Sequence, residues 1–468
     1  MSEVEEKEHT RGPKSREPVA DRALVLVPLQ RGRRAEEGAS DRDAEARVEE
    51  AAGLARAIDL EVVDALSVPL SALRPATLFG AGKVDELAPL IAHDRIGLVV
   101  VDHLLTPVQQ RNLEKAWKAK VIDRTGLILE IFGERAQTRE GRLQVELAHL
   151  TYQKSRLVRS WTHLERQRGG FGFLGGPGET QIEADRRVIS ERIDKIKKEL
   201  QTVVTRRRLQ RRSRKRSGYP VVALVGYTNA GKSTLFNALT RSGVFADDRL
   251  FATLDPTLRR VDLPNGTGII LSDTVGFVSD LPTTLVAAFR ATLEEVAEAD
   301  LILHVRDIAH PDTEAQAGDV AAVLTELDID VNDPARVIEV WNKIDLIPED
   351  ERPPRTIPPR AGTGKSDGSP LVVTVAALTG EGLPDLLTAI EARIVENDVI
   401  FRVELHGDAV ADLHRLYEMG DVLDRQDRED GAIFASVRVP VETLDRFRAA
   451  FPGARREAAA EAPATQIA

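Results

Sequence analysis

The chain has 468 residues, no cysteine and a formal net charge of −11 at pH 7. At the usual ~150 residues per domain, this length predicts about three domains, and a hydrophobic content of 42% is enough for packed cores. The lack of cysteine excludes disulfides and thiolate metal sites. Residues 1–21 lack the apolar segment of a signal peptide, and no run reaches ~18 apolar residues. We therefore expect a cytoplasmic protein with no membrane span.

Residues 1–20 are charged, with almost no large apolar side chains, and are predicted to be disordered. Over residues 21–125, strand and helix patterns alternate, which favours a small parallel-sheet α/β domain. The predicted strands are Ala23–Val27, Glu61–Val63, Gly97–Val101 and Val121–Asp123, and the predicted helices are Asp41–Ile58 and Thr106–Ala119. The segment Gly80–Lys83 opens a further helix. It could bind an anion there, but it lacks P-loop spacing, and an ordinary strand-to-helix turn is the favoured interpretation.

Residues 126–218 are predicted to form a helical hairpin. Residues 127–159 have a helical pattern with an interruption near Thr138, and residues 183–214 form a long charged helix. Between them, residues 168–180 are rich in glycine and are predicted to be a mobile loop. Phe171 and Phe173 in this loop suit stacking on nucleic-acid bases; the alternative is a linker whose aromatic rings pack against a neighbour.

Positive charge is concentrated between Arg186 and Arg216 of this acidic chain. Such a segment predicts a polyanionic partner held by one region. A solvated helix face or a basic linker explains the composition equally well, and both interpretations stay open at this point.

The most informative segment is Gly-Tyr-Thr-Asn-Ala-Gly-Lys-Ser-Thr at residues 226–234, between a predicted strand at 220–225 and a predicted helix at 234–239. This is the context and spacing of a P-loop. Gly226 and Gly231 let successive backbone N–H groups face one point at a helix N-terminus, which favours phosphate. Lys232 supplies a positive charge for the β- and γ-phosphates, and Ser233 a hydroxyl for Mg²⁺.

Four later motifs complete the pattern of a GTP site. Asp273 follows the predicted strand 269–272 and can hold Mg²⁺ through water, and Gly276 can offer its N–H to the γ-phosphate. Thr253 lies in the intervening loop, where it can complete the Mg²⁺ shell when the γ-phosphate is present. The Asp345 carboxylate can accept two hydrogen bonds from guanine, which adenine cannot donate. Lys343 can lie across the base, and the N–H of Ala377 can bind guanine O6.

Residues 219–397 therefore form a predicted G domain, with further strands at 258–263, 301–305, 336–341 and 371–375. Residues 352–370 are rich in Pro, Gly and Ser and are predicted to be a disordered insertion. Residues 398–452 show strand, helix, strand, strand and helix patterns, which predict a small α+β domain. Residues 453–468 are predicted to be a disordered tail.

These motifs, with the Phe-Ala-Thr-Leu-Asp-Pro-Thr segment at 251–257 and the glycine-rich loop ending in Glu179-Thr180-Gln181, resemble those of the HflX family of ribosome-associated GTPases. The resemblance covers roughly residues 21–451. It implies a multidomain α/β chain: an N-terminal α/β domain with a helical hairpin, a central Ras-like P-loop G domain and a small C-terminal α+β domain. It also implies binding to the large ribosomal subunit and its RNA, separation of stalled ribosomes into subunits, and partial association with ribosomes or membrane. We expect a monomer.

The predicted catalytic residues are Lys232, Thr253 and Gly276, and the predicted metal ligands are Ser233 and Thr253. The predicted cofactors are Mg²⁺ with GTP or GDP. The residues predicted to bind the nucleotide are Gly226, Tyr227, Thr228, Asn229, Ala230, Gly231, Lys232, Ser233, Thr234, Phe251, Ala252, Thr253, Leu254, Asp255, Asp273, Thr274, Val275, Gly276, Asn342, Lys343, Ile344, Asp345, Ala376, Ala377 and Leu378.

Four residues qualify this prediction. Phe277 stands where many GTPases carry a glutamine that orients the attacking water, so we expect slow hydrolysis that a partner stimulates; the HflX family shares this apolar residue. Ala376 replaces the usual serine before the guanine-contacting alanine, which is expected to loosen that loop. Asn229 could ligate K⁺, although an ordinary P-loop residue is at least as good an interpretation. His310 is interpreted as a structural turn residue rather than a catalytic one.

Two other classes of function compete with the ribosomal GTPase. In the first, an RNA-remodelling protein hydrolyses a second nucleotide near Gly80–Lys83. In the second, an RNA-binding scaffold uses GTP only for regulation or folding, which predicts ribosome affinity independent of nucleotide.

Overall fold

The computed structural model describes residues 22–30, 44–167, 177–216, 219–241, 250–251, 253–279, 290–359, 369–396, 398–428, 431–440 and 443–456. The predicted N-terminal tail, Phe171, Phe173 and Ala252 lie outside these ranges.

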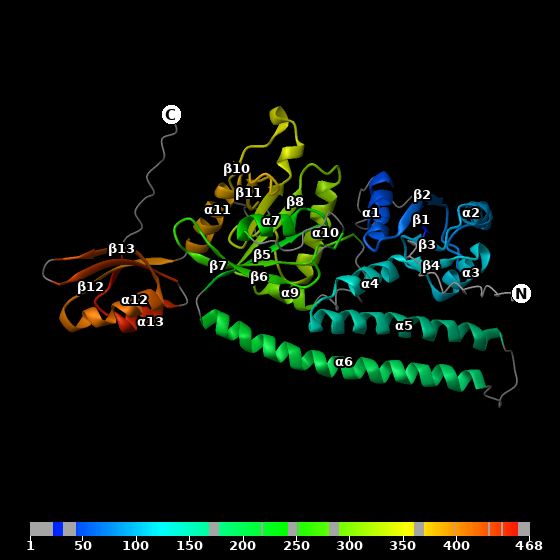
Figure 1. Cartoon of the computed structure of the whole chain (residues 1–468), viewed down its shortest axis with the longest axis horizontal. Helices are drawn as coiled ribbons and strands as arrows, with labels where there is room; N and C mark the ends of the chain where they lie inside the picture. Colours follow the sequence, from blue (N-terminus) through cyan, green and yellow to red (C-terminus); the bar gives the residue numbers. More distant parts are fainter. Residues whose placement is uncertain are drawn as a thin grey trace, which may run out of the picture.

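The N-terminal domain is a four-stranded parallel sheet in the order β2-β1-β3-β4, as predicted. One face packs against α1 and α4 and the other against α2 and α3 (Figure 1). Its elements are β1 (Arg22–Gln30), α1 (Ala44–Arg56), β2 (Glu61–Leu70), α2 (Ala81–His93), β3 (Leu98–Val101), α3 (Pro107–Trp117), β4 (Lys120–Asp123) and α4 (Arg124–Arg135). All five residues of the predicted first strand, 23–27, are fully buried, since both sheet faces are covered.

Two long helices, α5 (Arg139–Gln167) and α6 (Pro177–Arg216), lie antiparallel, as the hairpin prediction requires (Figure 1). Ion pairs between Arg192 and Glu146 at 2.6 Å and between Arg139 and Glu199 at 3.4 Å fix their register. The loop prediction for residues 168–180 is wrong for 177–180, which already belong to α6. The reason is Pro177 at the first helical position, where a missing N–H costs nothing and the ring presets φ.

The G domain is a seven-stranded sheet in the order β10-β11-β9-β8-β5-β7-β6, in which β6 and β10 pair antiparallel and the other neighbours pair parallel. The strands are β5 (Val221–Gly226), β6 (Thr257–Asp262), β7 (Gly268–Asp273), β8 (Leu301–Asp307), β9 (Val337–Asn342), β10 (Thr356–Ile357) and β11 (Leu371–Thr374). The described helices are α7 (Lys232–Thr240), α9 (Arg290–Ala297), η2 (Ile344–Leu346), η3 (Glu349–Glu351), α10 (Thr313–Glu326) and α11 (Leu383–Val395).

One prediction about the G domain is wrong in part. Residues 352–370 were expected to form a disordered insertion, but residues 356–357 form β10 and pair with β11 at the edge of the sheet. A two-residue edge strand carries almost no hydrophobic pattern of its own, so composition alone misses it. Residues 360–368 of this segment lie outside the described ranges.

The C-terminal domain is an antiparallel sheet in the order β13-β14-β12-β15, with two helices on its apolar face (Figure 1). Its elements are β12 (Val399–Leu405), η4 (Gly407–Asp412), α12 (Leu413–Met419), β13 (Asp421–Asp427), β14 (Ile433–Val439), α13 (Leu444–Ala450) and β15 (Arg455–Arg456). Burial alternates along β14, as expected for a sheet covered on one side. The tail prediction is wrong at residues 455–456, which pair with β12.

The N-terminal domain and the G domain share one hydrophobic core. It combines residues of α4, such as Phe132, and of α5, such as Val145, with Tyr227, Phe251 and Phe277 of the G domain. The nucleotide loops therefore lie against the N-terminal domain rather than facing only solvent. In the described part of the chain, no helix is long and apolar enough to cross a membrane.

Candidate GTP-binding and hydrolysis site

The P-loop has the backbone geometry that its motif requires. It leaves β5 at Gly226 and enters α7 at Lys232, with Gly231 in the left-handed region at a φ of 91°. A Cβ at Gly226 would overlap the carbonyl of Val305, and one at Gly231 would overlap the amide of Asn342. Only glycine fits either position, so β8 and β9 hold the curled loop directly against the sheet.

Lys232 is buried within this loop. Its Nζ donates a hydrogen bond to the Tyr227 carbonyl at 2.7 Å. The pKa of Lys232 is lowered to about 8, chiefly because the side chain is buried; Asp273 opposes this shift and the nearby Lys343 adds to it. The ammonium is therefore poorly compensated by the protein alone, and phosphate oxygens are the natural counter-charge.

Three oxygens converge beside the P-loop. Ser233 Oγ lies 2.8 Å from both Thr253 Oγ1 and Asp273 Oδ2, and Thr253 Oγ1 lies 2.9 Å from the same Asp273 oxygen. Asp273 is fully buried, its Oδ1 has no hydrogen-bond partner, and burial raises the pKa of its carboxyl group. A hard cation with oxygen ligands fits this set, since it would satisfy the orphan oxygen and offset the desolvated charge.

Asn342 connects the P-loop to the predicted guanine-binding loop. Its Nδ2 donates to the Ala230 carbonyl at 2.9 Å, and its Oδ1 accepts the N–H of Ala377 at 3.0 Å. Lys343 has a φ of 66°, and its Nζ forms an ion pair with Asp307 at 2.7 Å. The motif is therefore brought together with residues 376–378, as the sequence predicts.

The Ala376 loop is closed by its backbone. The N–H of Ala376 donates to the Glu381 carbonyl, and the Ala376 carbonyl accepts the N–H of Gly380, both at 2.9 Å. These two backbone hydrogen bonds close the loop, and they oppose the loosening that Ala376 is expected to cause. Leu378 is 82% exposed and lies at the rim of the loop.

The segments that carry Thr253 and Gly276 continue into contacts with the N-terminal domain. We call residues 250–255 the first switch segment and residues 276–279 the second. Phe277 forms a parallel bridge with Tyr227 and is buried, and a Cβ at Gly276 would lie 2.8 Å from Thr228 Cγ2. The second segment thus packs directly on the P-loop.

Three predicted nucleotide ligands direct their side chains elsewhere. Phe251 packs edge-on against Phe132 with ring centroids 4.9 Å apart, and Leu254 is buried in the shared core. The Asp255 carboxylate accepts hydrogen bonds from the turn before α5. Sequence reasoning also missed Glu50, Arg124 and Ser279, which link the domains; no local motif marks them.

Two other candidates are accounted for by local contacts. The His310 ring accepts the N–H of Asp312 through Nδ1 at 3.0 Å, which is the structural turn role that was favoured. At the start of α2, Lys83 forms an ion pair with Glu86 at 2.7 Å, and Gly80 caps the helix without a side-chain bond. Neither contact resembles the converging groups beside Lys232.

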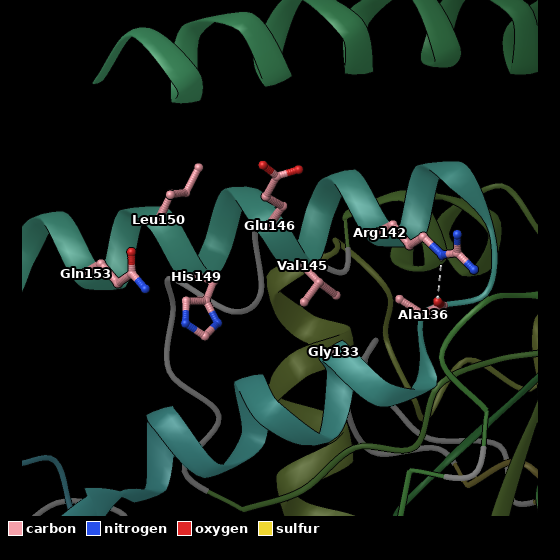
Figure 2. A pocket seen from close by; sticks show the side chains of 8 residues that line it. All are labelled: Gly133, Ala136, Arg142, Val145, Glu146, His149, Leu150 and Gln153. Carbon is pink, nitrogen blue, oxygen red and sulfur yellow. Dashed lines mark hydrogen bonds between the residues drawn. The ribbon is translucent and has the colours of Figure 1, made fainter. Parts of the chain in front are cut away.

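A separate pocket of about 300 Å³ lies between α4 and α5 (Figure 2). It is lined by Gly133, Ala136, Arg142, Val145, Glu146, His149, Leu150 and Gln153. Figure 2 shows Arg142 bonded to the Ala136 carbonyl at one end of this pocket, beside the turn that joins the two helices.

Within the described residues, no group of three or more His, Cys, Asp or Glu side chains could hold a metal ion. The oxygen cluster at Ser233, Thr253 and Asp273, two hydroxyls with one carboxylate, is instead the arrangement typical of a P-loop site. A curled phosphate loop, an adjacent cluster of oxygens that fits a cation, and an Asn-Lys-x-Asp motif lie at one edge of the sheet. This fold and this site define a P-loop GTPase.

Four family descriptions match successive parts of the chain. They are "GTP-binding GTPase N-terminal" at residues 45–133, "GTP-binding GTPase Middle Region" at 135–214, "50S ribosome-binding GTPase" at 221–343 and "HflX C-terminal domain" at 363–451. Among curated proteins, GTPase HflX of Magnetococcus marinus is 53% identical over 375 residues, which cover 80% of this chain and 82% of that protein. GTPase HflX of Escherichia coli K12 is 42% identical over 401 residues, covering 86% and 91%.

The chain belongs to the HflX family of GTPases. It is a GTP-hydrolysing enzyme whose G domain is of the 50S ribosome-binding class. Among solved structures, a GDP complex of a GTP-binding protein from Sulfolobus solfataricus is similar at 21% identity and a TM-score of 0.42, over 80% of this chain and 98% of that one.

Proposed function

We propose that this protein binds the large ribosomal subunit in its GTP state and separates stalled or idle ribosomes into subunits. One observation carries the proposal: both switch segments are hydrogen-bonded to the N-terminal domain and the turn that begins the α5–α6 hairpin. Because switch segments respond to the γ-phosphate, a change of nucleotide would alter the hydrogen bonds that hold the base of the hairpin.

Ser279 is the contact on the second switch segment. Its carbonyl and hydroxyl each accept a hydrogen bond from Arg124 at 2.9 Å, and its hydroxyl donates to Glu50 at 2.7 Å. Its N–H donates to the hydroxyl of Tyr227 at 2.8 Å, and that hydroxyl in turn binds Glu50. Glu50 and Arg124 belong to the N-terminal domain and are nearly buried. This hydrogen-bond network is therefore an internal contact between the domains and not a weak contact at the surface.

Ribosomal RNA suits the hairpin as a partner. With 29 and 40 residues, α5 and α6 are roughly 45 and 60 Å long at 1.5 Å per residue. The sequence of residues 206–216 contains eight Arg or Lys and no Asp or Glu, and phosphate backbones bind such segments through charge. The predicted contacts of Phe171 and Phe173 with RNA remain part of this proposal.

In the catalytic cycle, Lys232 would neutralise the β- and γ-phosphates, and Ser233 and Thr253 would hold Mg²⁺ with Asp273 in its outer shell. The bound ion would supply charge stabilisation of the phosphoryl group. Gly276 would donate its N–H to the γ-phosphate. Phe277 is buried and cannot orient water, which supports slow hydrolysis by the protein alone and a rate increase when the ribosome orders both switch segments.

Ribosome sedimentation with the purified protein under GTP, GDP and a non-hydrolysable GTP analogue tests the proposal, with phosphate release followed in parallel. We expect the analogue alone to promote subunit separation, and ribosomes to accelerate hydrolysis. Equal binding in all three states, with hydrolysis unchanged by ribosomes, would contradict it. Repeating the assay in K⁺ and in Na⁺ shows whether Asn229 serves a monovalent ion, and sedimentation of the protein alone tests the expected monomer.

The two competing functions make different predictions in the same assays. A second nucleotide site near Gly80–Lys83 requires residual hydrolysis in Lys232→Ala, whereas the proposal predicts none. A scaffold that uses GTP only for folding binds ribosomes equally in every nucleotide state.

A further inference from the structure

Asp255 lies two residues after Thr253 and points away from the phosphate loop. Its Oδ2 accepts the backbone N–H groups of Gln137 and Thr138 at 2.9 and 2.8 Å, and its Oδ1 accepts the Thr138 hydroxyl at 2.5 Å. Thr138 is the residue before α5, and its own Oγ1 accepts the N–H of Gly141 at 2.9 Å. A carboxylate of the G domain therefore binds the two residues just before α5, beside the positive dipole end of that helix.

The fit around this carboxylate is close. A Cβ at Gly141, in the first turn of α5, would overlap Asp255 Oδ1. The turn itself is braced from the other side, where Arg142 Nε donates to the Ala136 carbonyl at 3.3 Å (Figure 2). The groups that donate to the Asp255 carboxylate are thus held in place by the N-terminal half of the chain and not by the nucleotide loops.

Thr253 is held between two such attachments. On one side, Phe251 is 2% exposed, has a φ of 58° and packs against Phe132 of α4. On the other side, Asp255 is bonded to the turn before α5. Between them, Thr253 Oγ1 lies within 2.9 Å of Ser233 Oγ and Asp273 Oδ2. Two residues of extended chain span about 7 Å at most, so the bonds of Asp255 limit how far Thr253 can move.

We propose that Asp255 is a positioning residue: by binding the turn before α5, it holds Thr253 at the Mg²⁺ site and couples the GTP state to the base of the hairpin. This inference rests on the proposed role of Thr253 as a ligand of Mg²⁺ in the GTP state. A coupling of this kind is reciprocal, so GTP also stabilises the α4–α5 turn in its present geometry.

Gly141→Ala is the test variant, because residue 141 lies in the N-terminal half and the three atoms nearest to an added Cβ there all belong to Asp255. Alanine is a better helix former than glycine, so α5 is kept while the added Cβ displaces the carboxylate. Gly133→Ala on α4, where a Cβ would meet nothing within 4 Å, is the matched control. Asp255→Ala removes the same contact from the side of the G domain.

We expect Gly141→Ala and Asp255→Ala each to weaken binding of a non-hydrolysable GTP analogue on the order of tenfold, with GDP affinity unchanged within about twofold. Both variants should need more Mg²⁺ for half-maximal hydrolysis, and the double variant should match either single one. Gly133→Ala should behave as the wild type. Unchanged analogue affinity in both variants, or an equal loss for GDP, overturns the inference.

Thr253→Ala separates this inference from the proposed function. If Thr253→Ala does not weaken binding of the analogue more than binding of GDP, then the proposed role of Thr253 is wrong. If it does, but Gly141→Ala and Asp255→Ala do not, the Mg²⁺ role stands and only the positioning role of Asp255 fails.

Discussion

Lys232 carries a charge that the protein does not balance by itself. In the nucleotide-free protein its pKa lies near 8, below the ordinary 10.5, chiefly because it is buried. Between these two values the folded chain binds fewer protons than the unfolded chain, so this group's contribution to the free energy of unfolding rises with pH over that window. Nucleotide binding has the opposite requirement, since the phosphates need the protonated ammonium.

We therefore expect GDP affinity to fall about tenfold between pH 7 and pH 9, with proton uptake on binding that is small at pH 7 and close to one proton at pH 9. Fluorescence titration with a labelled GDP at each pH measures this. Guanine N1–H also loses its proton in alkaline solution, so Lys232→Met supplies the reference curve. Equal slopes for the wild type and Lys232→Met would show that Lys232 binds GDP without a protonation change.

Asp345 is the residue proposed to select the base. It follows Lys343 in a helical turn, where it is half-buried and beside the loop of Ala377 that Asn342 holds in place. In Asp345→Asn the carboxamide cannot accept both guanine donors. Losing one hydrogen bond and the charge that strengthens the other corresponds to roughly 100-fold weaker GTP binding. Xanthosine triphosphate, which presents a carbonyl in place of the guanine amine, should bind the variant better than GTP. Competition titrations measure both, and an unchanged preference would contradict the assignment.

At the scale of elements, Asp123 joins the sheet of the N-terminal domain to the hairpin. It caps α4 by accepting the N–H of Gly126 at 2.9 Å and also accepts the N–H of Leu105 at 3.2 Å. From α5, Tyr152 donates to it at 2.6 Å and Arg156 forms an ion pair with it. Burial and this carboxylate raise the pKa of the Tyr152 hydroxyl, which keeps it a donor at any physiological pH.

Asp123→Ala leaves Arg156 without its buried partner and removes the cap of α4. We expect the free energy of unfolding of the N-terminal domain to fall by about 3–5 kcal/mol, seen as a lower denaturant midpoint in circular dichroism. Asp194→Ala, an exposed position on α6, should change it by less than about 0.5 kcal/mol. A loss as small as that of the control would show that the hairpin is anchored elsewhere.

The elements show how far sequence patterns reach. The strand β3 and the helix α3, with its Thr106 capping box, were predicted to within about two residues because local chemistry determines them. The predicted strands 23–27 and 61–63 are shorter than β1 and β2. The two-residue strands β10 and β15 were not predicted, because their pairing partners determine them rather than their own residues. At the site, the P-loop and Asn342 were predictable from motifs, whereas the direction of Asp255 depends on a turn 117 residues away.

At the scale of the whole molecule, the N-terminal domain and the G domain pack together beside the predicted nucleotide loops. The shared core fixes their orientation, and polar bonds to each switch segment lie at its edge. Apolar burial is indifferent to which nucleotide is bound, but hydrogen bonds to a moving segment are not. Sequence analysis could divide the chain into domains but could not show this contact, because Glu50 and Ser279 are 229 residues apart.

Arg124 is a residue of the N-terminal domain that donates hydrogen bonds to Ser279 of the second switch segment. Its guanidinium donates to Asp102 and Glu50 as well as Ser279. Arg124→Lys therefore keeps the positive charge but loses the planar, branched group that donates to all three. We expect GDP affinity and hydrolysis by the protein alone to stay within about twofold, while hydrolysis stimulated by ribosomes falls on the order of tenfold.

Phosphate release with and without large subunits measures the Arg124→Lys effect, with Arg111→Lys on the exposed side of α3 as the matched control. The control should keep full stimulation, since it alters a charged surface position without touching the network. If stimulation survives in Arg124→Lys, the ribosome acts on the switch segments without passing through the N-terminal domain. If hydrolysis by the protein alone falls equally, Arg124 supports the fold of the second switch segment rather than its response to the partner.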